Sequence, residues 1–174
     1  MSNMYVKRLR PLPPNSKLLV LGAGFSGQRI ATIARGLGSK VLCSRRNEKS
    51  PWANIVFDSK AQLRPPKHLL QDVTHLLSCI PPENNGEDPV LQNLEEQLKE
   101  MPLQWVGYLS TTGVYGNCHG KWVSECDLPN PKQERSKRRL ACEKAWQSSG
   151  LPVQILRLPG IYGPGRSAIT SVKN

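Results

Sequence analysis

Short apolar runs alternate along this chain with longer segments in which apolar residues recur at helical spacing. Each run is a few residues long and ends at a glycine, a proline or a polar residue, which is typical of a strand buried on both faces. The pattern predicts six strands, at 17–24, 39–46, 53–59, 73–82, 104–112 and 151–160.

The spacing of apolar residues also predicts three longer helices between these strands. They cover 25–38, where Ile30 and Ile33 recur at helical spacing, 89–100, and the basic segment 133–146. Strands that alternate with helices favour a parallel sheet with right-handed crossovers. The predicted fold class is therefore α/β: a Rossmann-type doubly wound parallel sheet of about six strands with helices on both faces.

The length of 174 residues suits one folded domain, which we place at 17–166. Residues 1–16 are expected to form a flexible, basic, proline-rich leader, and residues 167–174 a tail. The leader lacks the apolar stretch of a secretory signal, and no apolar run reaches the roughly 18 residues that a membrane span needs. We therefore expect a cytoplasmic protein with no membrane partner.

The net charge of the chain indicates which kind of partner it favours. The chain has 24 Lys and Arg against 13 Asp and Glu, a net charge of +11, which favours anionic partners such as nucleotides, nucleic acid or phosphorylated metabolites. Its five cysteines are odd in number and widely spaced, without a Cys-x-x-Cys pair. We expect free thiols in a reducing compartment and no metal site.

A glycine-rich turn follows the first predicted strand. The segment GAGFSG, at 22–27, has the spacing G-x-G-x-x-G and opens the first predicted helix. In such a turn the three glycines permit the tight bend, the approach of a pyrophosphate and close packing of helix on strand. The helix N-terminus then offers N–H groups to phosphates. The predicted cofactor residues here are Gly22, Gly24, Phe25, Ser26 and Gly27; the alternative is a glycine turn that serves packing alone.

The end of the second strand bears on which dinucleotide is bound. An acidic residue there contacts the adenosine ribose when the cofactor is NAD. This chain instead has Ser44, Arg45 and Arg46, with no acid until Glu48. Arginine pairs with a 2′-phosphate through charge-assisted hydrogen bonds. We therefore expect NADP in preference to NAD, unless the two arginines are merely solvated.

Two further segments, STTGVYG at 110–116 and LRLPGIYGPG at 156–165, carry a family likeness. Together with GAGFSG they resemble the extended short-chain dehydrogenase/reductase family, the NAD(P)-dependent sugar-nucleotide epimerases and dehydratases. The resemblance runs from about residue 17 to 166. It implies hydride transfer involving a sugar nucleotide or a related carbonyl or alcohol substrate.

The resemblance also implies further cofactor contacts. It places Asp58, at the end of the third strand, beside the adenine amino group, although a strand-end cap is an equal alternative. The segment SCIPP, containing Ser78 and Pro81, would lie beside the cofactor but departs from the family's small-residue pattern. The backbone that follows the sixth strand would lie beside the nicotinamide, at Pro159, Gly160 and Ile161.

On the substrate side, the resemblance implies that Thr111, with Ser110 just before it, bonds the substrate oxygen. Dehydratases of the family carry an Asp-Glu pair next, as acid and base. Here Thr112 and Gly113 occupy those positions. The chain is therefore not a sugar-nucleotide dehydratase of the usual kind.

The basic helix corresponds to the family's Tyr-x-x-x-Lys segment. Aligning through Glu143 places the lysine position at Arg139 and the tyrosine position at Arg135, the register we prefer; the alternative uses Lys137 and Gln133. Neither register supplies a tyrosine, which marks the chain as atypical. An arginine does not donate its proton at neutral pH, but it can hold a ribose hydroxyl or neutralise an anionic substrate.

Tyr115 and Tyr162 are the nearest tyrosines by motif, and each matches a structural turn of the family. After YGPGR the family's chain builds a substrate-binding lobe. This sequence ends at Asn174, so it is either a fragment or a natural short form.

Three functions follow from these features. The first is an atypical NADP-binding epimerase or reductase, and the second is a catalytically silent NADP-binding or sensing protein. The third is nucleic-acid binding through RSKRR at 135–139, which the low aromatic content of 6% disfavours. The family resemblance leaves homodimer pairing open.

Overall fold

The computed structural model describes residues 9–46 and 53–167. Most of the predicted tail, the first half of the predicted leader and Glu48 lie outside these ranges. Within them, residues 9–16 approach the sheet, where Leu12 donates its backbone N–H to the Ser39 hydroxyl at 3.3 Å. None of the described helices is long and apolar enough to cross a membrane.

In the described part of the chain, six parallel strands form one sheet. They are β1 (Lys17–Leu21), β2 (Lys40–Arg45), β3 (Ile55–Val56), β4 (His75–Ser78), β5 (Trp105–Thr111) and β6 (Val153–Leu158). Their order is β3-β2-β1-β4-β5-β6, with every neighbouring pair parallel. The predicted Rossmann-type sheet is confirmed. The chain reverses its direction of winding between β1 and β4, and such a switch point is where ligands bind in open α/β sheets.

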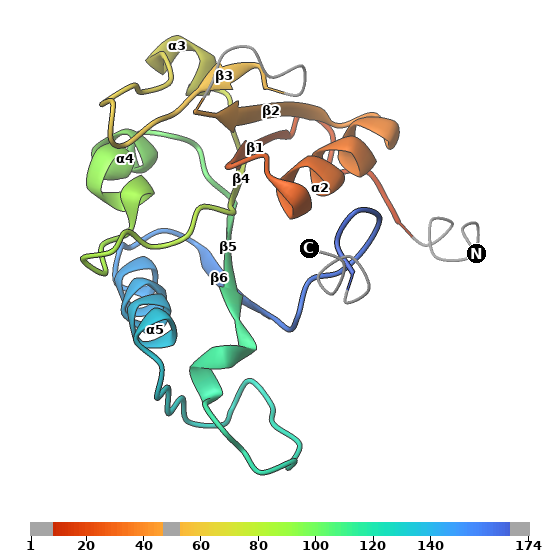
Figure 1. Ribbon diagram of the computed structural model, residues 1–174. Helices are drawn as coiled ribbons and strands as arrows, with labels where there is room; N and C mark the ends of the chain where they lie inside the picture. The colour runs from red at the N-terminus through yellow and green to blue at the C-terminus, as the bar shows by residue number, and fades with distance from the viewer. Residues whose placement is uncertain (1–8, 47–52, 168–174) are drawn as a thin grey trace.

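Helices cover both faces of the sheet, as predicted (Figure 1). On one face lies α2 (Phe25–Gly36), and on the other lie α4 (Pro89–Lys99) and α5 (Glu134–Gln147). The structure adds α3 (Lys67–Leu70) and the 3-10 helix η1 (Thr112–Tyr115), which the sequence analysis did not predict. Each spans four residues, too short for a periodic apolar pattern to develop.

The core explains why the strands are apolar at consecutive positions. Along β1, Leu19 and Leu21 join the core beneath α4 and α5, whereas Leu18 and Val20 join a smaller core beneath α2. Burial on both faces favours an apolar residue at every position rather than at alternate ones.

The apolar side of α2 is less buried than its sequence suggests. Ile30 and Ile33 are 37% and 46% exposed, and the buried residues of the helix are Gly27 and Ala31. The helix therefore rests on the sheet through its smallest side chains, which permit the closest approach.

Asp88 ties α4 to α5. One carboxylate oxygen accepts from the backbone N–H groups of Val90 and Leu91 at 2.9 and 3.1 Å and so caps the N-terminus of α4. The other accepts from the indole N–H of buried Trp146 at 2.9 Å. Burial raises the pKa of Asp88.

Candidate functional site

A pocket of about 490 Å³ opens at the carboxyl edge of the sheet, at the switch point. It brings together residues from the glycine turn and from the ends of β2, β3 and β4. The lining residues are Gly22, Ala23, Gly24, Ser44, Arg45, Arg46, Phe57, Asp58, Ser59, Lys60, Cys79, Ile80, Pro81, Pro82 and Glu83. Seven of the predicted cofactor residues are among them.

The glycine turn has the geometry that its motif requires. Gly22 has φ +85°, and a Cβ there would lie 2.8 Å from the Ile80 side chain. A Cβ on Gly27 would lie 2.6 Å from the Gly22 carbonyl oxygen, so this glycine lets α2 lie against β1. At Gly24 the nearest atom to such a Cβ is 4.0 Å away, so the space beside it is open.

The N-terminus of α2 is available to an anion. Gly24 is the N-cap residue and has no side chain to accept from the first backbone N–H groups. Ser26 lies half-buried in the first turn, and the Phe25 ring packs 3.8 Å from the Arg29 guanidinium. Open space at Gly24, and helix N–H groups that no side chain of the described residues caps, fit a pyrophosphate.

The end of β2 supplies a buried hydroxyl and two arginines. Ser44 accepts a hydrogen bond from the Gly22 backbone N–H at 3.0 Å, which fixes the glycine turn to β2. Arg46 is exposed, whereas Arg45 is half-buried and its Nε is buried without a hydrogen-bond partner among the described residues. An unpaired buried donor costs about 1–3 kcal/mol, so an anionic ligand at this position would stabilise Arg45.

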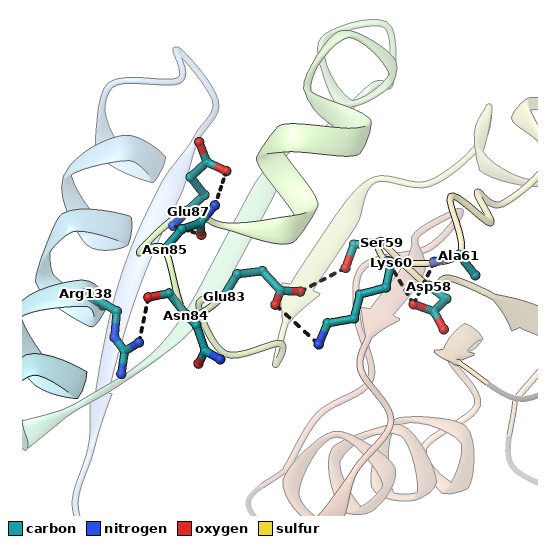
Figure 2. A network of polar contacts seen from close by, with 9 residues as sticks. All are labelled: Asp58, Ser59, Lys60, Ala61, Glu83, Asn84, Asn85, Glu87 and Arg138. Carbon is teal, nitrogen blue, oxygen red and sulfur yellow. Dashed lines mark hydrogen bonds and ion pairs between the residues drawn. The ribbon is translucent and has the colours of Figure 1, made fainter.

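Asp58 both lines the pocket and caps a turn. Its Oδ1 accepts from the backbone N–H groups of Lys60 and Ala61 at 3.0 and 3.4 Å (Figure 2). The strand-end cap is therefore present. Because Asp58 also lines the pocket, its contact with an adenine amino group remains a proposal.

The end of β4 meets the pocket through Cys79 and Pro81. Ser78 does not line it. Its hydroxyl is fully buried, without a partner among the described residues. Burial raises the pKa of the Cys79 thiol to about 12, with a smaller contribution from Cys43.

The predicted substrate-side residues separate into two environments. Thr111 is half-buried at the end of β5, and its hydroxyl accepts from the Gly113 backbone N–H at 3.1 Å. Ser110 is buried and donates instead to Oε1 of Glu143. Glu143 is 1% exposed and pairs with Arg157, whose Nη2 lies 2.8 Å from Oε2.

The two arginines of α5 also differ. Arg135 is exposed, and its Nε donates to the side-chain oxygen of Gln133 at 2.8 Å. Arg139 is half-buried, and Nη1 donates to the Tyr108 hydroxyl at 3.0 Å and the Leu109 carbonyl at 3.1 Å. Burial raises the pKa of Tyr108, so its phenol stays protonated.

The two tyrosines nearest to the motifs, Tyr115 and Tyr162, differ in exposure. Tyr115 is buried, with its hydroxyl accepting from Nη1 of Arg157 at 2.8 Å, and Tyr162 is 84% exposed. The exposed segment Pro159, Gly160 and Ile161 does not line the pocket. The chain then returns to α2, since a Cβ on Gly163 would lie 3.0 Å from the Phe25 ring.

Sequence reasoning missed two charged residues of the pocket, Lys60 and Glu83. They follow β3 and β4, and their side chains approach to 3.9 Å across the pocket (Figure 2). In the sequence, their one signal is that each residue follows shortly after a predicted strand. The carboxyl ends of parallel strands lie at the same edge of a sheet, so side chains that follow different strands can meet there.

No family model matches the chain. The Bacillus subtilis (strain 168) protein "Uncharacterized UDP-glucose epimerase YtcB" is 38% identical over 78 residues, which is 42% of this chain and 24% of that protein.

Three solved structures are similar over most of this chain. A functionally unknown conserved protein from Silicibacter pomeroyi is 32% identical, with a TM-score of 0.79, and the match covers 90% of this chain and 57% of that one. A protein assigned as an NAD-dependent epimerase/dehydratase, from Methylobacillus flagellatus, is 28% identical, with a TM-score of 0.72 and coverage of 87% and 56%.

The third is UDP-glucuronic acid 4-epimerase from Bacillus cereus in complex with NAD. It is 23% identical, with a TM-score of 0.65 and coverage of 84% and 57%, and this likeness concerns the fold. The chain thus spans less than three-fifths of the length of each of these three solved chains.

Proposed function

The chain belongs to the NAD-dependent epimerase/dehydratase family, within the extended short-chain dehydrogenases/reductases, and we propose that its pocket binds a nicotinamide dinucleotide, NADP in preference to NAD. The observation that carries the proposal is that three features meet at one pocket: an open glycine turn, a helix N-terminus without a side-chain cap, and a buried Arg45 Nε that has no partner among the described residues. Each of these features would be satisfied by a phosphate of the ligand.

The preference for NADP rests on the end of β2. In the described chain, the residues there that line the pocket are Ser44, Arg45 and Arg46, and the Ser44 hydroxyl is engaged with Gly22. A 2′-phosphate offers three acceptor oxygens and negative charge to the guanidinium groups, whereas a 2′-hydroxyl offers neither. Because a structural relative contains NAD, NAD is the competing ligand in the test.

For catalysis, we propose hydride transfer between the dinucleotide and a sugar-nucleotide or related carbonyl or alcohol substrate. When bound, the nicotinamide supplies the hydride chemistry. The Thr111 hydroxyl accepts from Gly113, so its own proton is available to a substrate oxygen. Exposed Arg135 and the nitrogens of Arg139 other than Nη1 would hold an anionic substrate or a ribose hydroxyl.

A second candidate function is cofactor binding without turnover. One observation favours it: Arg139, at the position of the family's lysine, directs Nη1 to Tyr108 and Leu109 of β5. In addition, α5 contains no tyrosine. Steady turnover of any carbonyl substrate with NADPH would exclude this function.

The proposal is tested by titrating the purified chain with NADPH and NADH, following nicotinamide fluorescence at two salt concentrations. A charge-assisted contact is worth about 1.5–3 kcal/mol, so NADPH should bind about 10- to 100-fold more tightly than NADH at low salt. A variant carrying both Arg45→Gln and Arg46→Gln should bring the two affinities together. Saturation by neither ligand would contradict the proposal.

Gly24→Ala tests the phosphate site without a change in folding. Its Cβ would meet no protein atom closer than 4.0 Å, so the variant should fold as the wild type does. The methyl group would occupy the space that the pyrophosphate needs. Both dinucleotides should therefore lose affinity, with no change in the melting temperature.

A further inference from the structure

A contact crosses the pocket from the loop after β4 to the turn after β3. The Ser59 hydroxyl donates to Glu83 Oε1 at 3.1 Å, and Lys60 Nζ lies 3.9 Å from Glu83 Oε2. Figure 2 shows the Glu83 side chain extending from its loop toward these two residues. All three residues line the pocket, so the contact joins two of its walls.

The loop that carries Glu83 is anchored on α5. Nη1 of Arg138 donates to the Asn84 carbonyl at 2.8 Å, and the Cys142 thiol donates to the Gly86 carbonyl at 3.3 Å. Within the loop, the Glu83 backbone N–H donates to the Glu87 carbonyl at 2.9 Å. Glu83 therefore extends from a loop that is held to a helix.

The turn on the other side is held as a unit. Asp58 caps it through the backbone N–H groups of Lys60 and Ala61, and Asp58 and Leu63 exchange two backbone hydrogen bonds at 2.9 and 3.0 Å. Because Ser59 lies inside this turn, fixing its hydroxyl fixes the wall to which Asp58 belongs.

The hydrogen bond matters more than the ion pair. The side chains of Lys60 and Glu83 are 71% and 34% exposed, and exposed pairs at such a distance contribute little. Ser59 is half-buried and its hydroxyl reaches the carboxylate directly. The acceptor oxygen of Glu83, more than its charge, is what joins the walls.

We propose that Glu83 is a positioning residue for cofactor binding, which closes the adenosine end of the pocket by holding the Asp58–Ala61 turn through Ser59. This inference rests on the proposed function. If this wall of the pocket is already ordered in the free protein, ligand binding does not have to order it. The entropic cost of binding is then smaller and the affinity is higher. In the described chain, neither Ser59 nor Glu83 makes a hydrogen bond or ion pair with Arg45 or Arg46. The contact therefore strengthens NADPH and NADH binding by the same factor, whereas the arginines determine their ratio.

The test compares dissociation constants of the wild-type chain with those of Glu83→Ala, Ser59→Ala and the double variant. Each single change should weaken NADPH and NADH alike by about fivefold, the contribution of one hydrogen bond. The double variant should be no weaker than either single variant, since both remove the same contact. Adenosine 2′,5′-bisphosphate, the adenosine half of the ligand, should lose affinity by the same factor.

Two further variants separate positioning from general damage. Glu83→Gln keeps a carbonyl oxygen for Ser59 and should bind like the wild type. Glu87→Ala removes a carboxylate from the same loop, where it accepts from the Asn85 side chain, and should also bind like the wild type.

Wild-type affinity in Glu83→Ala, additive losses in the double variant, or a changed NADPH to NADH ratio would each overturn the inference. In all three cases the wild-type chain still binds dinucleotide, so the proposed function stands. A wild-type chain that binds neither ligand would overturn the proposed function, and this inference with it.

Discussion

The buried carboxylate of Glu143 joins three elements, and its removal gives a large expected loss of stability. Glu143 lies on α5 and is 1% exposed. Arg157 of β6 contacts it with Nη2 at 2.8 Å and with Nε at 3.2 Å from each oxygen, and Ser110 of β5 donates to Oε1. Glu143→Ala removes all of these contacts at once.

The magnitude follows from what the substitution leaves behind. The Arg157 side chain is 18% exposed, and its remaining hydrogen-bond partner in the described chain is the Tyr115 hydroxyl at 2.8 Å. The hydrogen bonds of Glu143 raise the pKa of Arg157 above its already high ordinary value, so it remains a cation. Removing one partner of a buried pair costs about 3–5 kcal/mol, and partial hydration of Arg157 favours the lower end, about 3 kcal/mol.

Urea unfolding and thermal melting, both followed by far-ultraviolet circular dichroism, measure this loss. For a chain of this length about 3 kcal/mol corresponds to a fall of roughly 6–12 °C in the melting temperature. Replacing both charged residues, as Glu143→Met with Arg157→Met, should cost less than Glu143→Ala, because no unpaired charge remains buried.

Glu134→Ala is the control on the same helix. It removes an exposed ion pair with Lys137, at 2.6 Å, and should leave the melting temperature nearly unchanged. A Glu143→Ala variant that melts at the same temperature as the wild type would contradict this expectation, because the contacts of Glu143 would then make no net contribution to stability.

Two further predictions concern the region where α2 meets the sheet. Burial raises the pKa of Cys79 from 9.0 to about 12. The burial of the neutral thiol therefore stabilises the fold fully below pH 9, and this stabilisation is lost as the pH rises toward 12. From pH 8 to 10.5 under reducing conditions, the wild type should lose about 2 kcal/mol more than Cys79→Ala in urea unfolding, and equal losses would count against a buried thiol. In Gly27→Ala the new Cβ would lie 2.6 Å from the Gly22 carbonyl, so we expect about 1–3 kcal/mol of destabilisation by overpacking. The control Gly36→Ala, whose Cβ meets nothing within 4 Å, should melt at or above the wild-type temperature.

Local patterns were sufficient for most of the fold. β1 and β4 are buried on both faces, and their consecutive apolar residues carry that information directly. The glycine turn was equally legible, because Gly22 and Gly27 are required by backbone conformation and close packing that few other residues allow. Where α2 was concerned, the periodicity of Ile30 and Ile33 predicted the helix but not its orientation on the sheet.

The site residues were predictable only in part. Ser110 and Thr111 are adjacent in sequence, yet successive side chains of a strand point to opposite faces. Ser110 therefore joins the buried network of Glu143, while Thr111 stays half-buried at the strand end. The alignment that places Arg139 at the family's lysine position does not reveal that its guanidinium reaches Tyr108.

Local patterns were enough to predict the succession of six strands and three longer helices along the chain, the glycine turn and the two arginines after the second strand. These features depend on periodicity and on backbone geometry within a few residues, which a linear pattern records. The folded chain was needed to find which side chains meet across the sheet edge, such as Ser59 with Glu83, and across helix and sheet, such as Glu143 with Arg157. Such contacts join residues 14 to 24 positions apart, and their partners are set by how the elements pack, which no local pattern records.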